Sequence, residues 1–243
     1  MVSDARPATD GGRAAPASQT LSRGIRVLEV LADAPGPLTT DEVSTALGVH
    51  RSIAYRLVRT LEDHGLVVRD SAARIALGAR MAALAANVSR DLQAEALPEL
   101  TAIANELGIT SFIAVLDQAE CITLASVEPR HAVASMVQRP GSRHPVTVGA
   151  PGKVILSMLP ESDWPDGVSD RLRAETVETR ARGYATSHDE VIPSVQSVAV
   201  PLSLHGGRPA AIAVVYIGPR HDPAEVAVRL QRSAATIRGA LGG

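Results

Sequence analysis

The segment from residue 48 to residue 61 constrains this chain most, because its apolar and polar residues fall on opposite sides of one helix. The apolar residues recur at the i, i+3, i+4, i+7 spacing of a single stripe: Ala54, Leu57, Val58 and Leu61. Two positions earlier, about 200° around the helix, the same spacing holds for Ser52, Tyr55, Arg56 and Arg59. No acidic residue occurs between Gly48 and Leu61. The pattern predicts a helix with one buried side and one cationic side.

The neighbouring segments predict the motif to which this helix belongs. Apolar residues three to four apart indicate a first helix from Leu21 to the Pro-Gly-Pro breaker at residues 35–37. Thr39 and Glu42 form a capping-box signature for a short helix over residues 40–47, and Gly48 follows at the turn. Residues 66–69 and 74–77 flank a turn and predict a two-stranded wing. This order is typical of a winged helix-turn-helix.

In that motif the second helix of the pair enters the major groove of DNA, where phosphates and guanine edges accept hydrogen bonds. A charged helix face is often only a solvated face, and a winged helix can also serve protein contacts. The arginine-rich face favours double-stranded DNA. We expect DNA contacts at His50, Arg51, Ser52, Tyr55, Arg56 and Arg59, and contacts to flanking phosphates at Arg69 and Arg74.

Two runs in this half carry a family resemblance. Residues 21–28 (LSRGIRVL) and 47–62 (LGVHRSIAYRLVRTLE) resemble the IclR family of transcriptional regulators, and the match continues through Gly65 and Leu77-Gly78. The resemblance implies a DNA-binding winged helix with contacts at Arg51, Ser52, Tyr55 and Arg56. Ile53 departs from the family, whose members often carry Thr there. It can meet a thymine methyl or simply pack.

The rest of the chain alternates helices and strands. An alanine-rich helix over residues 79–92 and a further helix over 94–107 precede a β-hairpin over 110–127. Further strands are expected at 132–138, 195–204 and 210–217, and helices at 152–159, at 171–182 and from the Asp222-Pro223 cap to 241. The fold class is therefore α+β. We expect a disordered tail over 1–19, the winged helix-turn-helix over 20–78, a linker helix over 79–92 and an effector-binding domain over 93–243.

The second half shares the resemblance through residues 148–153 (VGAPGK), the segment 182–190 that begins RGYA, and Ile217-Gly218-Pro219. In the IclR family this domain is a GAF-like antiparallel sheet with flanking helices. Its pocket usually binds a small organic acid or related metabolite, and occupancy changes DNA binding. The resemblance implies effector contacts at Met136, Ala150, Gly152, Ser187, Ser197 and Val215. Family members often carry an acid near Ser187 and a small polar residue near Val215.

Composition excludes several other classes. The net charge of −2 means that DNA contacts must come from a local arginine cluster. The single cysteine, Cys121, cannot form an intramolecular disulfide. No apolar run approaches the roughly 20 residues of a membrane span, so we expect a cytoplasmic protein with no membrane partner. Because catalytic signatures such as G-x-S-x-G and H-E-x-x-H are missing, we expect no enzyme activity, no metal and no cofactor.

A single recognition helix reads only a few base pairs, so specific binding needs at least two of them. We therefore expect a homodimer or tetramer that binds a palindromic or repeated operator.

Overall fold

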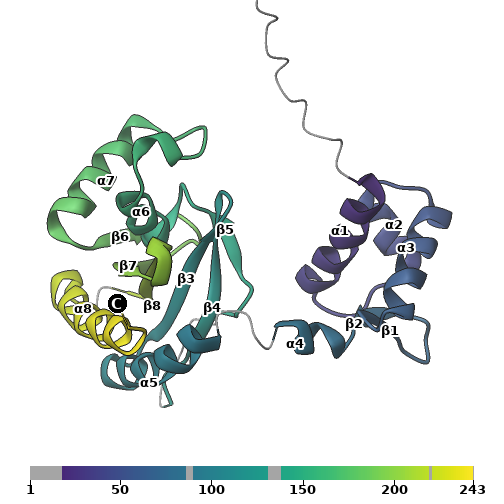
Figure 1. Ribbon diagram of the computed structural model, residues 1–243, viewed down its shortest axis with the longest axis horizontal. Helices are drawn as coiled ribbons and strands as arrows, with labels where there is room; N and C mark the ends of the chain where they lie inside the picture. The colour runs from purple at the N-terminus through teal and green to yellow at the C-terminus, as the bar shows by residue number, and fades with distance from the viewer. Residues whose placement is uncertain (1–17, 86–89, 131–137, 219–220, 243) are drawn as a thin grey trace, which may run out of the picture. The chain divides into compact units, whose positions relative to one another are not determined.

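The cationic helix belongs to the first of two units in the computed structural model, Met1–Val88, where a small core holds it (Figure 1). The second unit, Ser89–Gly243, is built on a large antiparallel sheet. The structure describes residues 18–85, 90–130, 138–218 and 221–242. Most of the expected tail, residues 1–17, lies outside these ranges. Helix α1 begins at Gln19, within the segment assigned to the tail.

The first unit has the predicted order of elements: α1 (Gln19–Asp33), α2 (Thr40–Leu47), α3 (Arg51–Asp63), β1 (Val67–Arg69), β2 (Ile75–Leu77) and α4 (Arg80–Ala85). Thr39 and Glu42 form both bonds of the predicted capping box at the start of α2. Gly48 ends that helix in the left-handed conformation, with φ of 63°. Strands β1 and β2 pair antiparallel as the wing. The predicted winged helix-turn-helix is confirmed.

The core of this unit explains how α3 is oriented. Its predicted apolar stripe is buried, and Ala54 and Val58 have no exposed surface. They pack with Val27 of α1, Val43 of α2 and Ile75 of the wing. Because the stripe faces inward, the polar side of α3 faces solvent.

The second unit is built on a six-stranded antiparallel sheet of order β5-β4-β3-β8-β7-β6. Its strands are β3 (Thr110–Asp117), β4 (Glu120–Val127), β5 (Arg143–Pro145), β6 (Ala185–His188), β7 (Val195–Ser203) and β8 (Pro209–Ile217). The hairpin β3-β4 and the strands β7 and β8 agree with the prediction. The strand expected at residues 132–138 lies almost wholly outside the described residues. Strands β5 and β6 were not predicted, since they are short and lack an apolar alternation.

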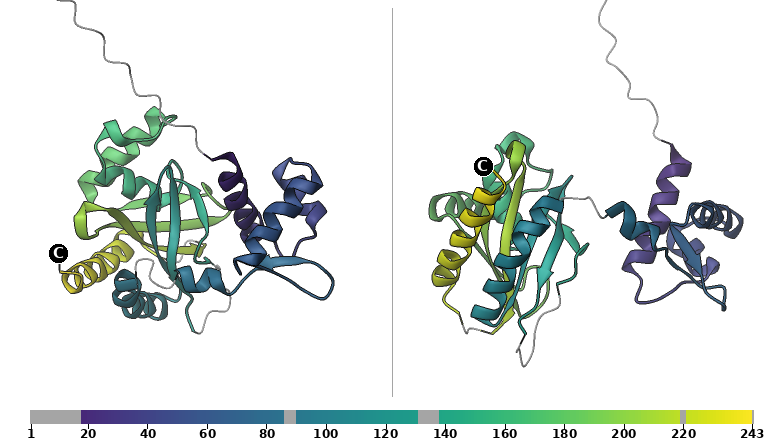
Figure 2. Two further views of the ribbon diagram at one scale, coloured as in Figure 1. Left: turned by 45° about the vertical axis from the view of Figure 1, so that its right-hand side comes forward. Right: turned by 60° about the horizontal axis from the view of Figure 1, so that its bottom comes forward.

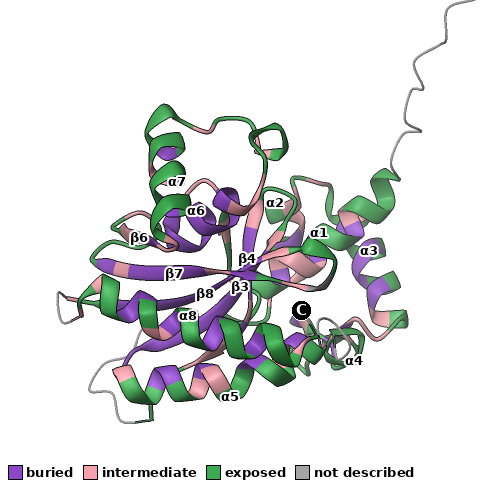
Figure 3. Ribbon diagram, turned by 60° about the vertical axis from the view of Figure 1, so that its left-hand side comes forward, coloured by how far each residue is buried: buried purple, intermediate pink, exposed green. Residues whose placement is uncertain are grey.

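Helices cover both faces of this sheet (Figures 2 and 3). Helices α5 (Arg90–Leu107) and α8 (Pro223–Ala240) lie on one face, and α6 (Gly149–Met158) lies on the other with α7 (Asp170–Arg182) packed beside it. Short 3₁₀ turns occur at Glu161–Asp163 and His205–Gly207. Along β8, Ile212 and Val214 contribute to the α5–α8 side, whereas Ala213 and Val215 contribute to the α6 side.

Helices α5 and α6 begin several residues earlier than predicted. Helix α6 begins at Gly149, three residues earlier than expected, and α5 begins at Arg90, inside the segment assigned to the linker helix. Residues 86–89 lie outside the described part of that segment. Within the described ranges, no helix combines the length and the apolar character that crossing a membrane requires.

Candidate nucleic-acid interface and effector cavity

The exposed side of α3 gathers the residues predicted to contact DNA. His50, Arg51, Ser52, Tyr55, Arg56 and Arg59 are all exposed. His50 caps the helix, because its Nδ1 accepts a hydrogen bond from the Ser52 backbone amide at 3.3 Å. The same nitrogen lies 2.9 Å from Ser52 Oγ. These contacts cap the start of the helix, where it would approach a groove.

The arginines of this face differ in what they contact. Arg51 Nε lies 2.9 Å from Asp41 Oδ1 of α2, and Arg59 Nε lies 3.9 Å from Asp63 Oδ1. All four of these side chains are well exposed, and exposed pairs of this kind contribute little to stability because water screens them. A phosphate can therefore replace either carboxylate at little cost.

The two wing arginines are engaged in contacts within the unit. Arg69 Nε lies 3.2 Å from Glu62 Oε2 of α3, and its guanidinium is 6.0 Å from the centre of the Tyr55 ring. Arg74 Nε donates to the Pro37 carbonyl at 2.8 Å, and its Nη2 lies 3.8 Å from Glu42 Oε2. Both side chains brace the wing against the helices. The sequence pattern did not reveal these acceptors because Glu62, Glu42 and Pro37 belong to other segments of the fold than the wing.

A cavity in the second unit lies between the sheet and the start of α6, with about 50 Å³ of room for water-sized molecules. Three residues predicted to contact an effector line it together: Ser187, Ser197 and Val215. They come from adjacent strands, where Ser197 of β7 pairs with Ser187 of β6 and with Val215 of β8. The register therefore places the three side chains in one row on the α6 face of the sheet.

Ser197 is the most informative residue of this row. It is 9% exposed, and its Oγ has no hydrogen-bond partner among the described residues. A buried hydroxyl without a partner costs about 1–3 kcal/mol. An unpartnered hydroxyl in the wall of a cavity indicates a group that a ligand can satisfy.

The other expected effector residues are placed differently. Ala150, in the first turn of α6, is fully buried and does not line the cavity. Gly152 does not line it either. It faces the backbone of Val146, where an added Cβ would lie 2.1 Å from the carbonyl oxygen. Their α6 neighbours Gly149 and Pro151 line the cavity instead. Met136 lies outside the described residues.

Sequence reasoning missed the rest of the wall, which consists of Phe112, Gln138, His144, Gly149, Pro151, Val191, Ile192 and Val195. His144 Nδ1 lies 3.0 Å from the Pro145 carbonyl oxygen. Because a carbonyl only accepts, Nδ1 is the donor in this contact. Strand alternation could have predicted Phe112 and Val195, but not residues that come from loops.

The start of α6 is held by an internal carboxylate. Glu190 Oε2 accepts from the Gly149 backbone amide at 2.9 Å, and its Oε1 lies 2.5 Å from Lys153 Nζ. Lys153 is buried and also lies 2.9 Å from Glu175 Oε2 of α7. This charged cluster connects α6, α7 and the loop that supplies Val191 and Ile192 to the cavity.

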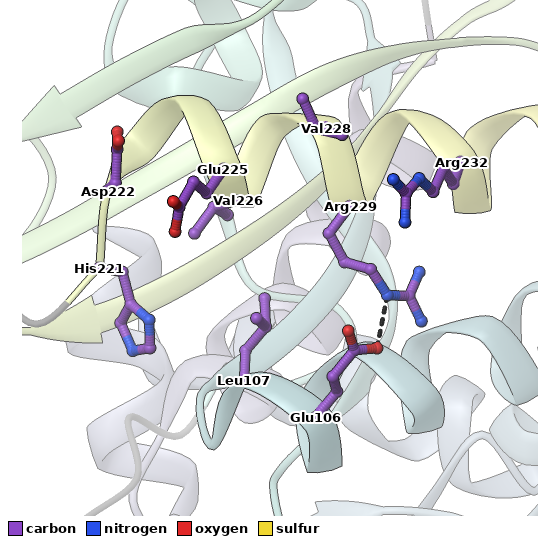
Figure 4. Close-up of a pocket in the computed structure, with 9 residues that line it drawn as sticks. All are labelled: Glu106, Leu107, His221, Asp222, Glu225, Val226, Val228, Arg229 and Arg232. Carbon is purple, nitrogen blue, oxygen red and sulfur yellow. Dashed lines mark hydrogen bonds and ion pairs between the residues drawn. The ribbon is translucent and has the colours of Figure 1, made fainter.

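A second hollow of about 400 Å³ lies between α5 and α8 (Figure 4). Its lining carries both signs of charge, including Glu106, Asp222, Glu225, Arg229 and Arg232. Arg229 Nε lies 2.6 Å from Glu106 Oε2, so this pair joins the two helices. Because Arg229 and Glu106 already pair with each other, this hollow is a weaker candidate for a ligand than the cavity at Ser197.

Two other chemistries find little support. Burial raises the pKa of the Cys121 thiol to about 12, so it stays protonated and unreactive at neutral pH. Within the ranges that the structure describes, no group of three or more His, Cys, Asp or Glu residues could hold a metal ion.

The first unit is a winged helix-turn-helix with an exposed cationic recognition helix, and the second is an antiparallel sheet with a lined cavity. Together in one chain they define the class of DNA-binding regulators with a sensor-like domain. Comparisons with known proteins identify the family. The IclR helix-turn-helix domain model matches residues 20–71, and the model of the bacterial transcriptional regulator IclR C-terminal domain matches residues 84–166. The chain belongs to the IclR family of transcriptional regulators.

Similar proteins agree with this assignment. The HTH-type transcriptional regulator XynR of Escherichia coli is 27% identical over 249 residues, covering 93% of this chain and 98% of XynR. The crystal structure of an IclR regulator from Alicyclobacillus acidocaldarius has a TM-score of 0.81 and 27% identity, covering 93% of this chain and 100% of that one. An IclR homolog from Microbacterium hydrocarbonoxydans, complexed with 4-hydroxybenzoate, has a TM-score of 0.80 at 22% identity, covering 92% and 99%. The chain is a transcriptional regulator and not an enzyme.

Proposed function

We propose that this regulator binds its operator through the exposed face of α3, at His50, Arg51, Ser52, Tyr55, Arg56 and Arg59. The observation that carries the proposal is the buried apolar stripe of α3, which leaves a cationic face in solvent. Arg69 and Arg74 support this face by bracing the wing, and they contact phosphates only if DNA displaces their internal partners.

We also propose that the protein acts in the cytoplasm as a homodimer or tetramer on a palindromic or repeated operator. One recognition helix spans only a few base pairs, so two half-sites are needed for useful specificity. The net charge of −2 supports a local interface over a generally cationic surface.

The DNA-binding proposal is tested by a gel shift of the full chain on a duplex that the wild-type protein enriches from a random pool. The double variant Arg56→Ala with Arg59→Ala should lose binding at moderate salt, because it removes charge-assisted donors from α3. A matched control is Arg232→Ala with Arg238→Ala on the exposed side of α8, which should bind like wild type. Unchanged binding by the α3 variant would contradict the proposal.

For the second unit we propose that the cavity at Ser197 binds a small organic acid or related metabolite, and that occupancy changes operator affinity. The orphaned Ser197 hydroxyl, the neighbouring Ser187 and the His144 ring offer hydrogen bonds, while Phe112, Val195 and Val215 offer apolar contact. A ligand with an apolar body and one or two polar groups matches this wall. The 4-hydroxybenzoate complex of the Microbacterium homolog supports such chemistry.

A thermal-shift screen tests the effector proposal, with benzoate, 4-hydroxybenzoate, pyruvate and glyoxylate as probes. A probe that occupies the cavity should raise the melting temperature of wild type, and Ser197→Ala should reduce that rise. Ser203→Ala, an exposed position on the same strand, is the control and should respond like wild type. A probe that stabilises the Ser197→Ala protein fully would show that it binds elsewhere.

A further inference from the structure

A third hollow lies in the DNA-binding unit, between α1 and α3, with room of about 270 Å³. It is lined by Thr20 and Arg23 of α1 and by Ile53, Arg56, Leu57 and Thr60 of α3. Leu57 is the buried floor, whereas Arg56 belongs to the exposed cationic face of α3. The hollow is therefore continuous with the face proposed to meet DNA.

The charges of this hollow are not balanced. Neither Arg23 nor Arg56 makes a side-chain hydrogen bond or ion pair with any part of the chain that the structure describes, and no carboxylate lines the hollow. Four other arginines of this unit each have an acidic partner: Arg51, Arg59, Arg69 and Arg74. An anion that enters the hollow is attracted by both guanidinium groups at once. The arrangement favours an anionic occupant.

The position of the hollow identifies the anion. A recognition helix in the major groove lies between two phosphate backbones, so side chains at its edge meet phosphate oxygens. We propose that Arg23 and Arg56 together bind one backbone phosphate of the operator, with the exposed Thr20 hydroxyl as a further donor. Helix α1, to which no contact had been assigned, thereby becomes part of the DNA interface. Such a contact positions α3 in the groove and carries no sequence information of its own.

Salt dependence tests this contact because each neutralised phosphate releases counterions. The probe is a fluorescein-labelled 30-base-pair duplex of mixed sequence, titrated with the full chain by anisotropy in 50–300 mM KCl. We expect Arg23→Gln to weaken binding about tenfold at the lower salt concentrations. Its slope of log K against log [KCl] should be shallower by about 0.9 for each phosphate that the variant no longer neutralises. Arg23→Lys should keep most of the slope, since it keeps the charge.

Arg26→Gln is the matched control, on the same helix and exposed but outside the hollow. It should leave the slope unchanged. The proposal is overturned if Arg23→Gln keeps the wild-type slope, or if Arg26→Gln reduces it equally, which would indicate a diffuse charge effect. Should Arg23→Gln melt at a lower temperature than wild type, the Arg23→Lys protein decides: a wild-type slope there upholds the phosphate contact. If the Arg56 and Arg59 double variant loses binding while Arg23→Gln binds like wild type, the proposed α3 interface is upheld and the role of α1 is rejected.

Discussion

At the scale of single residues, Gly152 shows how a missing side chain determines the position of α6. A Cβ at this position would lie 2.1 Å from the Val146 carbonyl oxygen and 2.9 Å from its carbon. Both atoms belong to the backbone, which cannot rotate away as a flexible side chain would. The close approach brings the start of α6 against the chain before it, beside the cavity.

The close approach at Gly152 predicts a cost in stability for any added side chain. Gly152→Ala should lower the free energy of unfolding by at least about 1–3 kcal/mol, because overpacking forces backbone shifts. Gly239→Ala in α8 has no atom within 4 Å of the added Cβ. It should be neutral or stabilising by up to about 1 kcal/mol. Urea unfolding of both variants measures the difference, and equal stability of the two would refute the packing argument.

Ser197 and Ser111 are both buried serines, but only one has a bonding partner. Ser111 Oγ donates to the Leu100 carbonyl at 2.7 Å, whereas Ser197 Oγ has no partner among the residues described. We predict that Ser111→Ala lowers the free energy of unfolding by about 1 kcal/mol and that Ser197→Ala leaves it unchanged or raises it. Denaturation without ligand compares them. A clear loss of stability in Ser197→Ala would mean that its hydroxyl is already satisfied.

At the scale of elements, a buried charged cluster joins α6 to α7. Lys153 of α6 is 4% exposed and contacts Glu175 of α7 as well as Glu190. Desolvation raises the pKa of Glu175, but hydrogen bonds from Lys153 and Arg171 outweigh it and lower the pKa below its ordinary 4.5. A carboxyl with a lower pKa in the folded state stabilises the fold above its unfolded pKa and loses that effect as the pH falls.

The pH dependence of stability tests this cluster. Wild type should be more stable than Glu175→Gln at pH 7, and the difference should shrink as the pH falls below 4.5 through the folded-state pKa. Glu178→Gln on the exposed side of the same helix is the control, and its difference from wild type should stay nearly constant with pH. A constant difference for Glu175→Gln would contradict the proposed role of this pair.

Element boundaries show which signals in the sequence were sufficient. The limits of α2 were predicted correctly because Thr39, Glu42 and Gly48 act through local hydrogen bonds and a local φ value. The strands β5 and β6 were missed because their pairing partners lie in β4 and β7, and their own residues carry little apolar pattern. The expected phosphate contacts of Arg69 and Arg74 stay a prediction, and only the fold reveals Glu62 and Pro37 beside them.

At the scale of the whole molecule, binding of DNA by one unit and of an effector by the other implies reciprocity. If an effector lowers operator affinity by some factor, the operator must lower effector affinity by the same factor. We expect calorimetry of an identified effector, with and without the operator duplex, to give equal coupling factors from both directions. Effector affinity that ignores the operator would rule out this regulation.

The assembly state is a separate prediction at this scale. Light scattering should give a mass of two or four times the 25.3 kDa of one chain. A monomer that binds a single half-site with full affinity would contradict the proposed dimeric recognition.

The sequence by itself determined the winged helix-turn-helix, the cationic face of α3 and the α+β class, because caps, turns and helical periodicity act over a few residues. Only the tertiary structure decided which arginines pair with acids and that Ser197 Oγ has no partner among the described residues, because these properties depend on how separate elements pack. It brought Arg23 of α1 and Arg56 of α3 to the wall of one hollow, and Ser197 beside Ser187 and Val215. Packing of distant segments creates such neighbours, and no local pattern encodes them.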